Sequence, residues 1–184
     1  MRKLSSYTFI TLNGMYKAEG DDISWHKHEQ EEADMSERML KLNNTLIFGR
    51  VTYEMMAYYW PSAMAQTSNP VVAKGMNDAE KIVISKKLKK AEWNNSRIIH
   101  TDMVDEIRKL KKTNGNDLTI LGSGSIVNQL AEAGLIDEFQ FLIDPIILSK
   151  GTPLFQGIKR QLNLNLIGSN VYKSGAVFLA YSAL

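Results

Sequence analysis

The sequence alternates between short apolar runs and segments with helical spacing, and this alternation restricts the fold more than any other feature. The apolar runs have the length of β-strands and are rich in β-branched and aromatic residues. We predict strands at residues 7–12, 45–48, 81–85, 97–100, 118–121, 138–143 and 176–181. Strands that alternate with helices are typical of a parallel sheet with crossover helices.

Helices are predicted between several of these strands. Apolar residues at positions 35, 39 and 42 recur with helical spacing in a charged context, and the same spacing is found at 104, 107 and 110. The second of these helices has a candidate N-cap at Thr101 or Asp102. A third helix is expected to start near Ser125 and to stop before Gly134, because glycine suits a left-handed C-terminal cap.

The last quarter of the chain shows no helical pattern. Strands expected at residues 137–148, 161–168 and 171–181 follow one another, with a turn at Asn170 or at Gly168 and Ser169, which indicates an antiparallel extension. Residues 64–77 have little pattern and are interpreted as a surface loop. With 184 residues, the chain is expected to form a single α/β domain with a mixed, mostly parallel central sheet and antiparallel C-terminal strands.

The charge balance favours a small-molecule ligand. The chain has 22 basic and 20 acidic residues and a net charge of +2, too little for the one-signed field that nucleic-acid and membrane-surface binders use. It has no cysteine, so it forms no disulfide and no thiolate metal site. The N-terminal segment lacks a long apolar stretch. We therefore expect a cytoplasmic protein without nucleic-acid or membrane partners.

Three predicted strand ends carry glycine or small polar residues, at the edge where open α/β sheets bind ligands. Their residues are Gly49, Arg50 and Thr52; Ser85 and Lys86; and Gly122, Ser123, Gly124, Ser125 and Ile126. Glycine allows the backbone to approach a pyrophosphate, and the N–H groups of a following helix can bind phosphate. Each of these turns also has a purely structural interpretation, because βα turns use glycine for steric reasons and surface lysines are usually solvated.

The order and spacing of several motifs resemble the dihydrofolate-reductase superfamily, and most closely the C-terminal reductase domain of the riboflavin-biosynthesis deaminase-reductase. The motifs lie at residues 11–14, 20–25, 49–54, 122–125, 135–138, 144–148 and 151–155, so the resemblance covers nearly the whole chain. It implies a three-layer α/β/α fold and an NADPH-dependent reductase. Its substrate would be a small heterocycle, such as 5-amino-6-(5-phosphoribosylamino)uracil.

The resemblance also implies roles for individual residues. Gly49, Arg50 and Thr52 would hold cofactor phosphates, Ser85 and Lys86 would lie near the adenosine 2′-phosphate, and residues 122–126 would cover the pyrophosphate. The nicotinamide would lie near Phe9, Thr11 and the loop after Asn13. The substrate would contact Phe9, Asn13, Trp25 and Tyr53, and Asp34 would be the catalytic acid.

Two positions depart from the pattern of the family. Asn13 stands where this group often has aspartate, which removes a charge at the mouth of the site. Ser123 stands in a glycine-rich turn, and serine keeps that turn if its φ is negative. Asp34 has a second interpretation as well, because Glu29, Glu31, Glu32 and Glu37 surround it in a run that is typical of a solvated helix face.

Other chemistry-bearing residues are assigned structural roles. His26 and His28 form a His-x-His pair without an evident third ligand, so we expect surface histidines and no metal. The residues Tyr53, Met55, Met56, Tyr58, Tyr59 and Trp60 indicate a helix used for packing or as a subunit interface.

Alternatives to an aminouracil reductase are a dihydrofolate or pterin reductase and a nucleotide-binding protein without catalysis. A complete deaminase-reductase is excluded, because its zinc deaminase domain needs cysteines. The apolar C-terminal strands offer an edge that a second copy can cover, so a homodimer is expected.

Overall fold

The computed structural model describes residues 1–28 and 30–184, which form a mixed α/β fold. The strands are β1 (Leu4–Thr11), β2 (Met15–Lys17), β3 (Thr45–Gly49), β4 (Lys81–Ile84), β5 (Ser96–Ile99), β6 (Leu118–Leu121), β7 (Glu138–Asp144), β8 (Thr152–Pro153), β9 (Leu164–Val171) and β10 (Val177–Ala183). The helices are α1 (Gln30–Leu40), α2 (Arg50–Tyr59), α3 (Ala63–Ser68), α4 (Pro70–Asp78), α5 (Met103–Lys111) and α6 (Gly124–Glu132), with a short 3-10 helix η1 at Glu19–Asp21. Within the described residues, no helix has both the length and the apolar character that crossing a bilayer requires.

The central sheet has eight strands in the order β5-β4-β3-β6-β1-β7-β10-β9. Every pair from β5 to β7 is parallel, whereas β10 is antiparallel to both β7 and β9. This confirms the mostly parallel sheet with antiparallel C-terminal strands. A separate two-stranded sheet pairs β2 with β8 and holds the first loop beside the main sheet.

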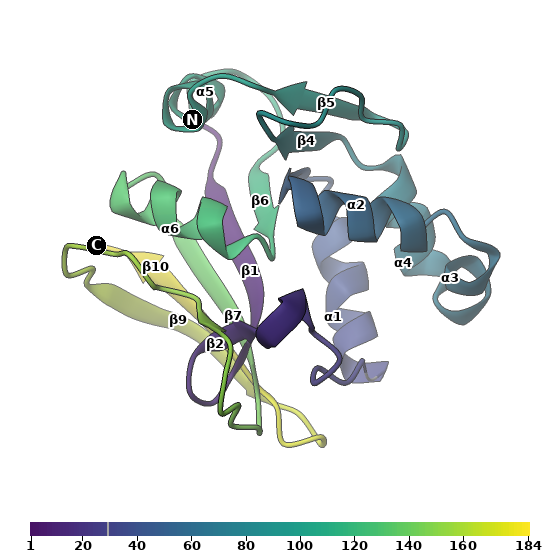
Figure 1. Cartoon of the computed structure of the whole chain (residues 1–184), viewed down its shortest axis with the longest axis vertical. Coiled ribbons are helices and arrows are strands. Elements are labelled where there is room, and N and C mark those ends of the chain that lie inside the picture. Colours follow the sequence, from purple (N-terminus) through teal and green to yellow (C-terminus); the bar gives the residue numbers. More distant parts are fainter. Residues whose placement is uncertain (29) are drawn as a thin grey trace.

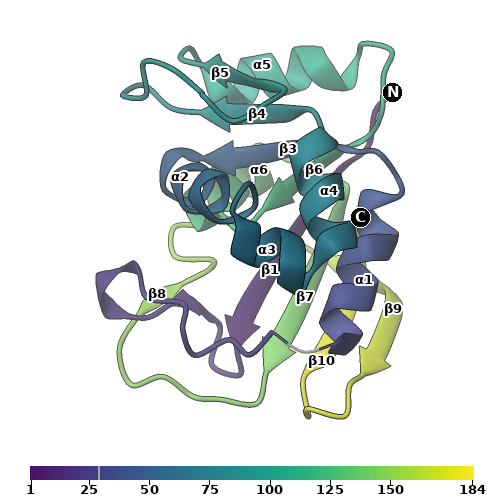
Figure 2. The same cartoon turned by 90° about the vertical axis from the view of Figure 1, so that its right-hand side faces the viewer.

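Helices cover both faces of the sheet (Figures 1 and 2). The helices α1, α2, α3 and α4 lie on one side and α5 and α6 on the other, which gives the three layers. The N-cap of α5 is Asp102, and Gly134 after α6 has a φ of +67°, so both sequence signals for helix ends are confirmed.

Alternation along the strands supplies the two apolar faces that these helices need. Ile47 and Ile82 pack in the core beneath α5 and α6, whereas Phe48 and Val83 pack with Tyr53 and neighbouring side chains on the opposite face. Successive side chains of a strand point to opposite faces, so the nearly continuous apolar runs in the sequence are those of strands buried on both sides.

The sheet leaves an opening beside β1. Strand β6 pairs with β1 only as far as Leu121, opposite Tyr7, whereas β1 continues along β7 to Thr11. The second half of β1 therefore has a strand neighbour on one side only. The opening lies at the carboxyl ends of β3 and β6, where open parallel sheets bind ligands.

Two predictions about the fold are wrong. Residues 64–77, expected to form a surface loop, belong to α3 and α4, and Val72, Ala73 and Met76 of α4 are buried. The turn between the last two strands is formed by residues 172–176, with Gly175 at a φ of +86°, and Gly168 lies inside β9 opposite Ala180. Gly168 is tolerated there because the strand is at the edge of the sheet, next to a β-bulge.

Candidate functional site

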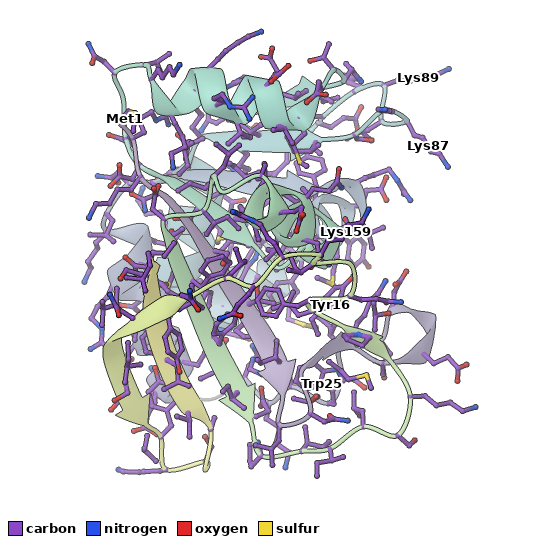
Figure 3. All side chains as sticks on the ribbon, turned by 90° about the vertical axis from the view of Figure 1, so that its left-hand side faces the viewer. Met1, Tyr16, Trp25, Lys87, Lys89 and Lys159 are labelled. Carbon is purple, nitrogen blue, oxygen red and sulfur yellow. The ribbon has the colours of Figure 1, made fainter. Side chains whose placement is uncertain are left out.

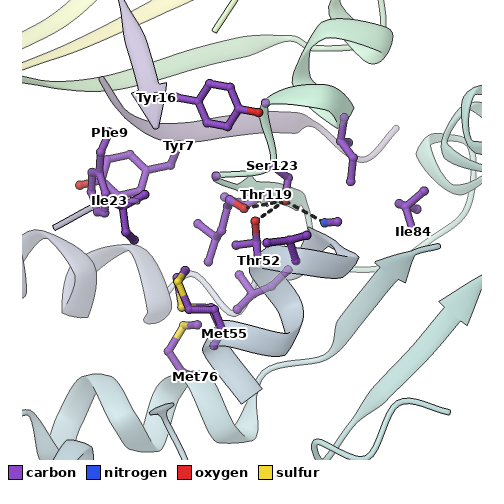
Figure 4. A pocket seen from close by; sticks show the side chains of 18 of the residues that line it. Tyr7, Phe9, Tyr16, Ile23, Thr52, Met55, Met76, Ile84, Thr119 and Ser123 are labelled. Carbon is purple, nitrogen blue, oxygen red and sulfur yellow. Dashed lines mark hydrogen bonds between the residues drawn. The ribbon is translucent and has the colours of Figure 1, made fainter. Parts of the chain in front are cut away.

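A cleft with a volume of about 1340 Å³ follows the opening in the sheet. Its walls come from β1, the first loop, α1, α2, the end of β4, the start of α5 and the turn between β6 and α6. Figure 4 shows Tyr7, Phe9, Thr52, Met55 and Ser123 around this space. Lys86 and Trp25 both lie in the cleft wall. Figure 3 shows Lys87, the neighbour of Lys86, far from Trp25, so the cleft runs between a cationic end and an aromatic end.

The turn between β6 and α6 is left-handed at two successive residues. Gly122 has a φ of +57° and Ser123 a φ of +53°, which corrects the expectation of a negative φ at Ser123. The hydroxyl of Ser123 accepts a hydrogen bond from the backbone N–H of Gly49 at 2.8 Å and donates one to Thr52 Oγ1 at 3.0 Å. This side chain ties the two glycine turns of the cleft together and stabilises the unusual backbone.

The same bonds decide which groups remain for a phosphate. The N–H of Gly49 is already engaged by Ser123, whereas the Thr52 hydroxyl only accepts from Ser123 and keeps its own O–H for another acceptor. The first N–H groups of α6, at Gly124 and Ser125, are also placed to bind an anion. The ring of Tyr16 lies directly against Gly124, where a Cβ would approach it to 2.6 Å. Tyr16 therefore covers the turn, and any side chain at position 124 would push its ring aside.

The cationic end of the cleft contains Arg50 and Lys86. Arg50, the first residue of α2, forms an ion pair with Glu54 one helical turn later, at 2.6 Å, and both side chains are half exposed. Ser85 also lies in the wall, but its hydroxyl accepts the N–H groups of Lys87 and Leu88 and so shapes the turn after β4. Lys86 is exposed and supplies the charge at this end.

The aromatic end of the cleft contains Tyr7, Phe9 and Trp25. The Tyr7 hydroxyl and the Trp25 Nε1 are buried and have no hydrogen-bond partner among the described residues. Burial, together with the nearby charge of Glu32, raises the pKa of Tyr7 well above its usual value, so the hydroxyl keeps its proton. These two donors are available to a ligand in the cleft.

His26 is buried in the wall of the cleft, which corrects the prediction of a surface histidine. Its Nδ1 lies 2.9 Å from Asp144 Oδ2 and its Nε2 lies 3.0 Å from Glu32 Oε2. Its ring stacks on Phe9 with centroids 3.8 Å apart and 16° between the planes. The exposed His28 turns towards the same carboxylate, with its Nδ1 3.3 Å from Glu32 Oε2.

The histidines and carboxylates of this cluster stabilise one another's charged forms. Burial by itself lowers the pKa of His26, but the hydrogen bonds and charges of Asp144 and Glu32 raise it to about 9. Burial likewise opposes ionisation of Glu32, whereas His26 and His28 hold the pKa of that carboxyl below its usual value. In this arrangement His26 is an imidazolium between two carboxylates.

The structure does not bring every predicted residue to the cleft. Asp34 is exposed and accepts a hydrogen bond from Gln30, and Glu32 on the same helix is the carboxylate that lines the cleft. The neighbouring Glu29 lies outside the described residues. Tyr53 is 3% exposed, and its hydroxyl accepts the N–H of Trp93, so it belongs to the core. Asp34 and Tyr53 point away from the cleft because neighbouring residues of a helix point in different directions.

Thr11 and Asn13 shape the first loop. Thr11 is buried, and its hydroxyl donates to Asn13 Oδ1 at 2.7 Å and accepts the N–H of Met15. The Asn13 amide donates to the backbone oxygen of Leu148 at 2.8 Å. Neither side chain lies in the cleft wall, so both are positioned to hold the loop that carries Tyr16.

The α2 helix contributes more to the cleft than its aromatic and methionine pattern predicts. Beyond its first turn, the residues that line the cleft, with Trp60 at the C-cap, are Met55, Met56, Tyr58, Tyr59 and Trp60. The methionine sulfur of Met56 accepts a hydrogen bond from Trp60 Nε1 at 3.1 Å. Tyr16, Met39 and Glu32 are further lining residues that sequence reasoning did not assign to the site. The only signal for the α2 residues is their clustering after Gly49, at a strand end.

Comparison with known proteins supports the fold and shows the family. The sequence profile of the RibD C-terminal domain matches residues 2–178. The Bacillus subtilis (strain 168) protein named "Uncharacterized protein YyaP" is 26% identical over 172 residues, which cover 94% of this chain and 90% of that protein.

Two solved structures show the same fold. A putative riboflavin biosynthesis protein from Shewanella sp. PV-4 superposes with a TM-score of 0.74 at 19% identity, covering 99% of both chains. The dihydrofolate reductase of Enterococcus faecalis, solved in complex with NADP(H) and RAB-propyl, superposes with a TM-score of 0.63 at 20% identity, covering 98% of this chain and 96% of that chain. The dihydrofolate-reductase-like fold expected from the sequence is thereby confirmed.

Proposed function

Since the chain belongs to the RibD C-terminal domain family and has a reductase-type fold, we propose that it is an NADPH-dependent reductase of a small heterocyclic substrate. The substrate class is a pyrimidine of the 5-amino-6-(5-phosphoribosylamino)uracil type, as in riboflavin biosynthesis. The observation that carries the proposal is the cleft itself, which joins a phosphate-compatible end to an aromatic end.

The residues of the cleft fit a dinucleotide phosphate. The N–H groups at the start of α6 and the cations Arg50 and Lys86 line the same cleft, which gives donors and positive charge along its length. Lys86 follows Ser85 at the end of β4, where the adenosine 2′-phosphate of NADPH would need a cation. Arg50 can turn from Glu54 to a phosphate because its side chain is half exposed.

The aromatic end suits a flat ring. When bound, the nicotinamide supplies the hydride, and the protein has to position the two rings and exclude water between them. Phe9 is held rigidly by its stack on His26, and Trp25 and Tyr7 each offer one unpaired donor to polar atoms of a heterocycle. Reduction also consumes a proton. Because Asp34 lies outside the cleft, this proton would come from bound water.

The cofactor half of the proposal is tested by titrating the protein with NADPH and with NADH while nicotinamide fluorescence is recorded. Lys86→Ala is expected to weaken NADPH binding about tenfold, because it removes the cation for the 2′-phosphate, and to leave NADH binding nearly unchanged. Lys89→Ala is the matched control, since Lys89 is exposed and lies outside the cleft wall. Absence of binding to both nucleotides would refute the proposal.

The substrate half is tested by turnover. Consumption of NADPH is followed with the aminouracil ribosyl phosphate and, separately, with dihydrofolate. Oxidation of NADPH with the aminouracil alone supports the proposal. Oxidation of NADPH with dihydrofolate alone favours a pterin reductase, in line with the structural likeness to the dihydrofolate reductase of Enterococcus faecalis. Tight NADPH binding without turnover on either substrate identifies a nucleotide-binding protein that has lost catalysis.

A further inference from the structure

The cluster around His26 brings three potential metal ligands to one point of the cleft wall. His26 Nε2, His28 Nδ1 and Glu32 Oε2 all lie within 4.8 Å of one another. His26 and His28 come from the loop before α1, and Glu32 comes from the first turn of that helix. His28 is not needed to satisfy the hydrogen bonds of His26, yet its ring turns to the same carboxylate oxygen.

We propose that His26, His28 and Glu32 form a binding site for one divalent transition-metal ion, with Zn²⁺ as the reference ion. A tetrahedral zinc ion bound at about 2.0–2.2 Å holds its ligand atoms about 3.3 Å apart. The distances from Glu32 Oε2 to the two histidine nitrogens are 3.0 Å and 3.3 Å. The third distance is at most 4.8 Å, and the exposed side chain of His28 is free to rotate towards the ion.

Asp144 supports the arrangement by holding His26, without itself binding the ion. Its carboxylate accepts a hydrogen bond from His26 Nδ1 at 2.9 Å, on the side of the ring opposite the proposed ion. A carboxylate in this position fixes the tautomer of a metal-binding histidine and makes the other nitrogen a better ligand. Phe9 stacks on the same ring and fixes its orientation.

The charges also favour a divalent ion. Glu32 and Asp144 are two buried carboxylates in contact with His26, and buried charge is costly unless it is balanced. A divalent ion with two neutral imidazoles balances the same two carboxylates completely.

Two histidines and one glutamate leave a fourth position open, as in zinc sites that bind a water or a substrate oxygen. All three ligands line the cleft, so the open position faces the space between Phe9 and Trp25. The ligand class for this position is a carbonyl oxygen or a water molecule. The site does not depend on the reductase proposal, because metal binding is measured without any nucleotide.

The test is a calorimetric titration of untagged, chelator-treated protein with Zn²⁺, accompanied by the visible absorption spectrum after addition of Co²⁺. We expect one equivalent of Zn²⁺ and the absorption bands of tetrahedral Co²⁺. The chain has three histidines and no cysteine. Therefore His28→Gln removes a ligand, and His100→Gln is the matched control for loss of a histidine elsewhere.

The variants give a graded expectation. His28→Gln and His26→Gln should abolish the bound equivalent, and Asp144→Asn should weaken it about 10–100-fold, as is usual for partners of metal-binding histidines. His100→Gln should bind as the unchanged protein does. Because His28 is exposed, His28→Gln is expected to fold, and circular dichroism establishes that it does.

Two results would overturn the proposal. The first is no binding of Zn²⁺ or Co²⁺ by the folded protein, which would leave the cluster as an imidazolium between carboxylates. The second is binding that His28→Gln and His26→Gln retain unchanged, which would place the ion elsewhere. NADPH titration of the metal-free protein separates this outcome from failure of the reductase proposal.

Discussion

Ser123 holds a backbone conformation that residues with a side chain seldom adopt, and its hydroxyl compensates for the strain. A left-handed conformation disfavours an L-residue by about 1–2 kcal/mol. The Ser123 hydroxyl accepts the N–H of Gly49 and donates to Thr52, so it joins β3, α2 and the β6–α6 turn. The cleft thus depends on one small polar side chain that connects segments far apart in the sequence.

Removal of this hydroxyl should weaken the protein measurably. Ser123→Ala is expected to lower the free energy of unfolding by about 1–3 kcal/mol, because the Gly49 N–H loses its buried acceptor while the left-handed strain stays. Ser123→Gly should lower it by about 1 kcal/mol less, since glycine adopts this conformation freely. Urea denaturation measures both values, with the exposed neighbour Ser125→Ala as the control. Equal losses for the alanine and glycine variants would argue against stored strain at Ser123.

At the scale of single residues, the sequence predicts site residues near the strand ends but not the role of His26. The His-x-His pair is visible in the sequence, and Glu32 lies only six residues after His26. Asp144, however, lies 118 residues away and reaches His26 only because β7 is the neighbour of β1 in the sheet. Burial of a histidine follows from such distant partners, and no local pattern contains them.

Lys81 joins two elements whose ends would otherwise lack hydrogen bonds. It opens β4, has no exposed surface, and its ammonium donates to the backbone oxygens of Asn77, Ala79 and Asn94. Its Nζ also lies 4.4 Å from the centre of the Trp93 ring. The lysine therefore caps the end of α4 and fixes the loop that leads to β5.

Lys81→Met keeps most of the apolar stem but removes the ammonium from three carbonyl groups. We expect the free energy of unfolding to fall by about 3 kcal/mol, because buried acceptors remain without donors. Thermal and urea denaturation measure this change. Lys74→Met, on the α4 helix that Lys81 caps, is the control; the exposed pair of Lys74 with Asp78 should contribute less than about 1 kcal/mol. A loss no larger than that of the control would contradict the capping role.

The α3 and α4 helices show where pattern reading fails for elements. These helices have only six and nine residues, so each shows at most two turns of the helical period. Start signals were nevertheless present: Ser62 accepts the N–H of Ala65 as an N-cap, and Pro70 occupies the first turn of α4. The strands were predictable because they are buried on both faces and read as continuous apolar runs.

At the scale of the whole molecule, the two edges of the sheet differ in how they resist pairing with another chain. Strand β5 has four residues and includes Arg97, which forms an ion pair with Glu80. Strand β9 has eight residues without a charge, and Leu166, Ile167 and Val171 are more than half exposed. Long, apolar and uncharged edges invite further strands.

The homodimer that the sequence suggests is therefore expected to form through β9. A two-fold axis would place two β9 strands antiparallel and extend the sheet across both copies. We predict a dimer mass in light scattering, and a monomer mass for the double variant Leu166→Lys and Ile167→Lys, which puts two charges on the exposed edge. The matched control is Leu42→Lys with Ile147→Lys, because both residues are similarly exposed but lie away from this edge. A monomer mass for the unchanged protein would refute the dimer. If the β9 double variant stays dimeric, the interface lies on another surface.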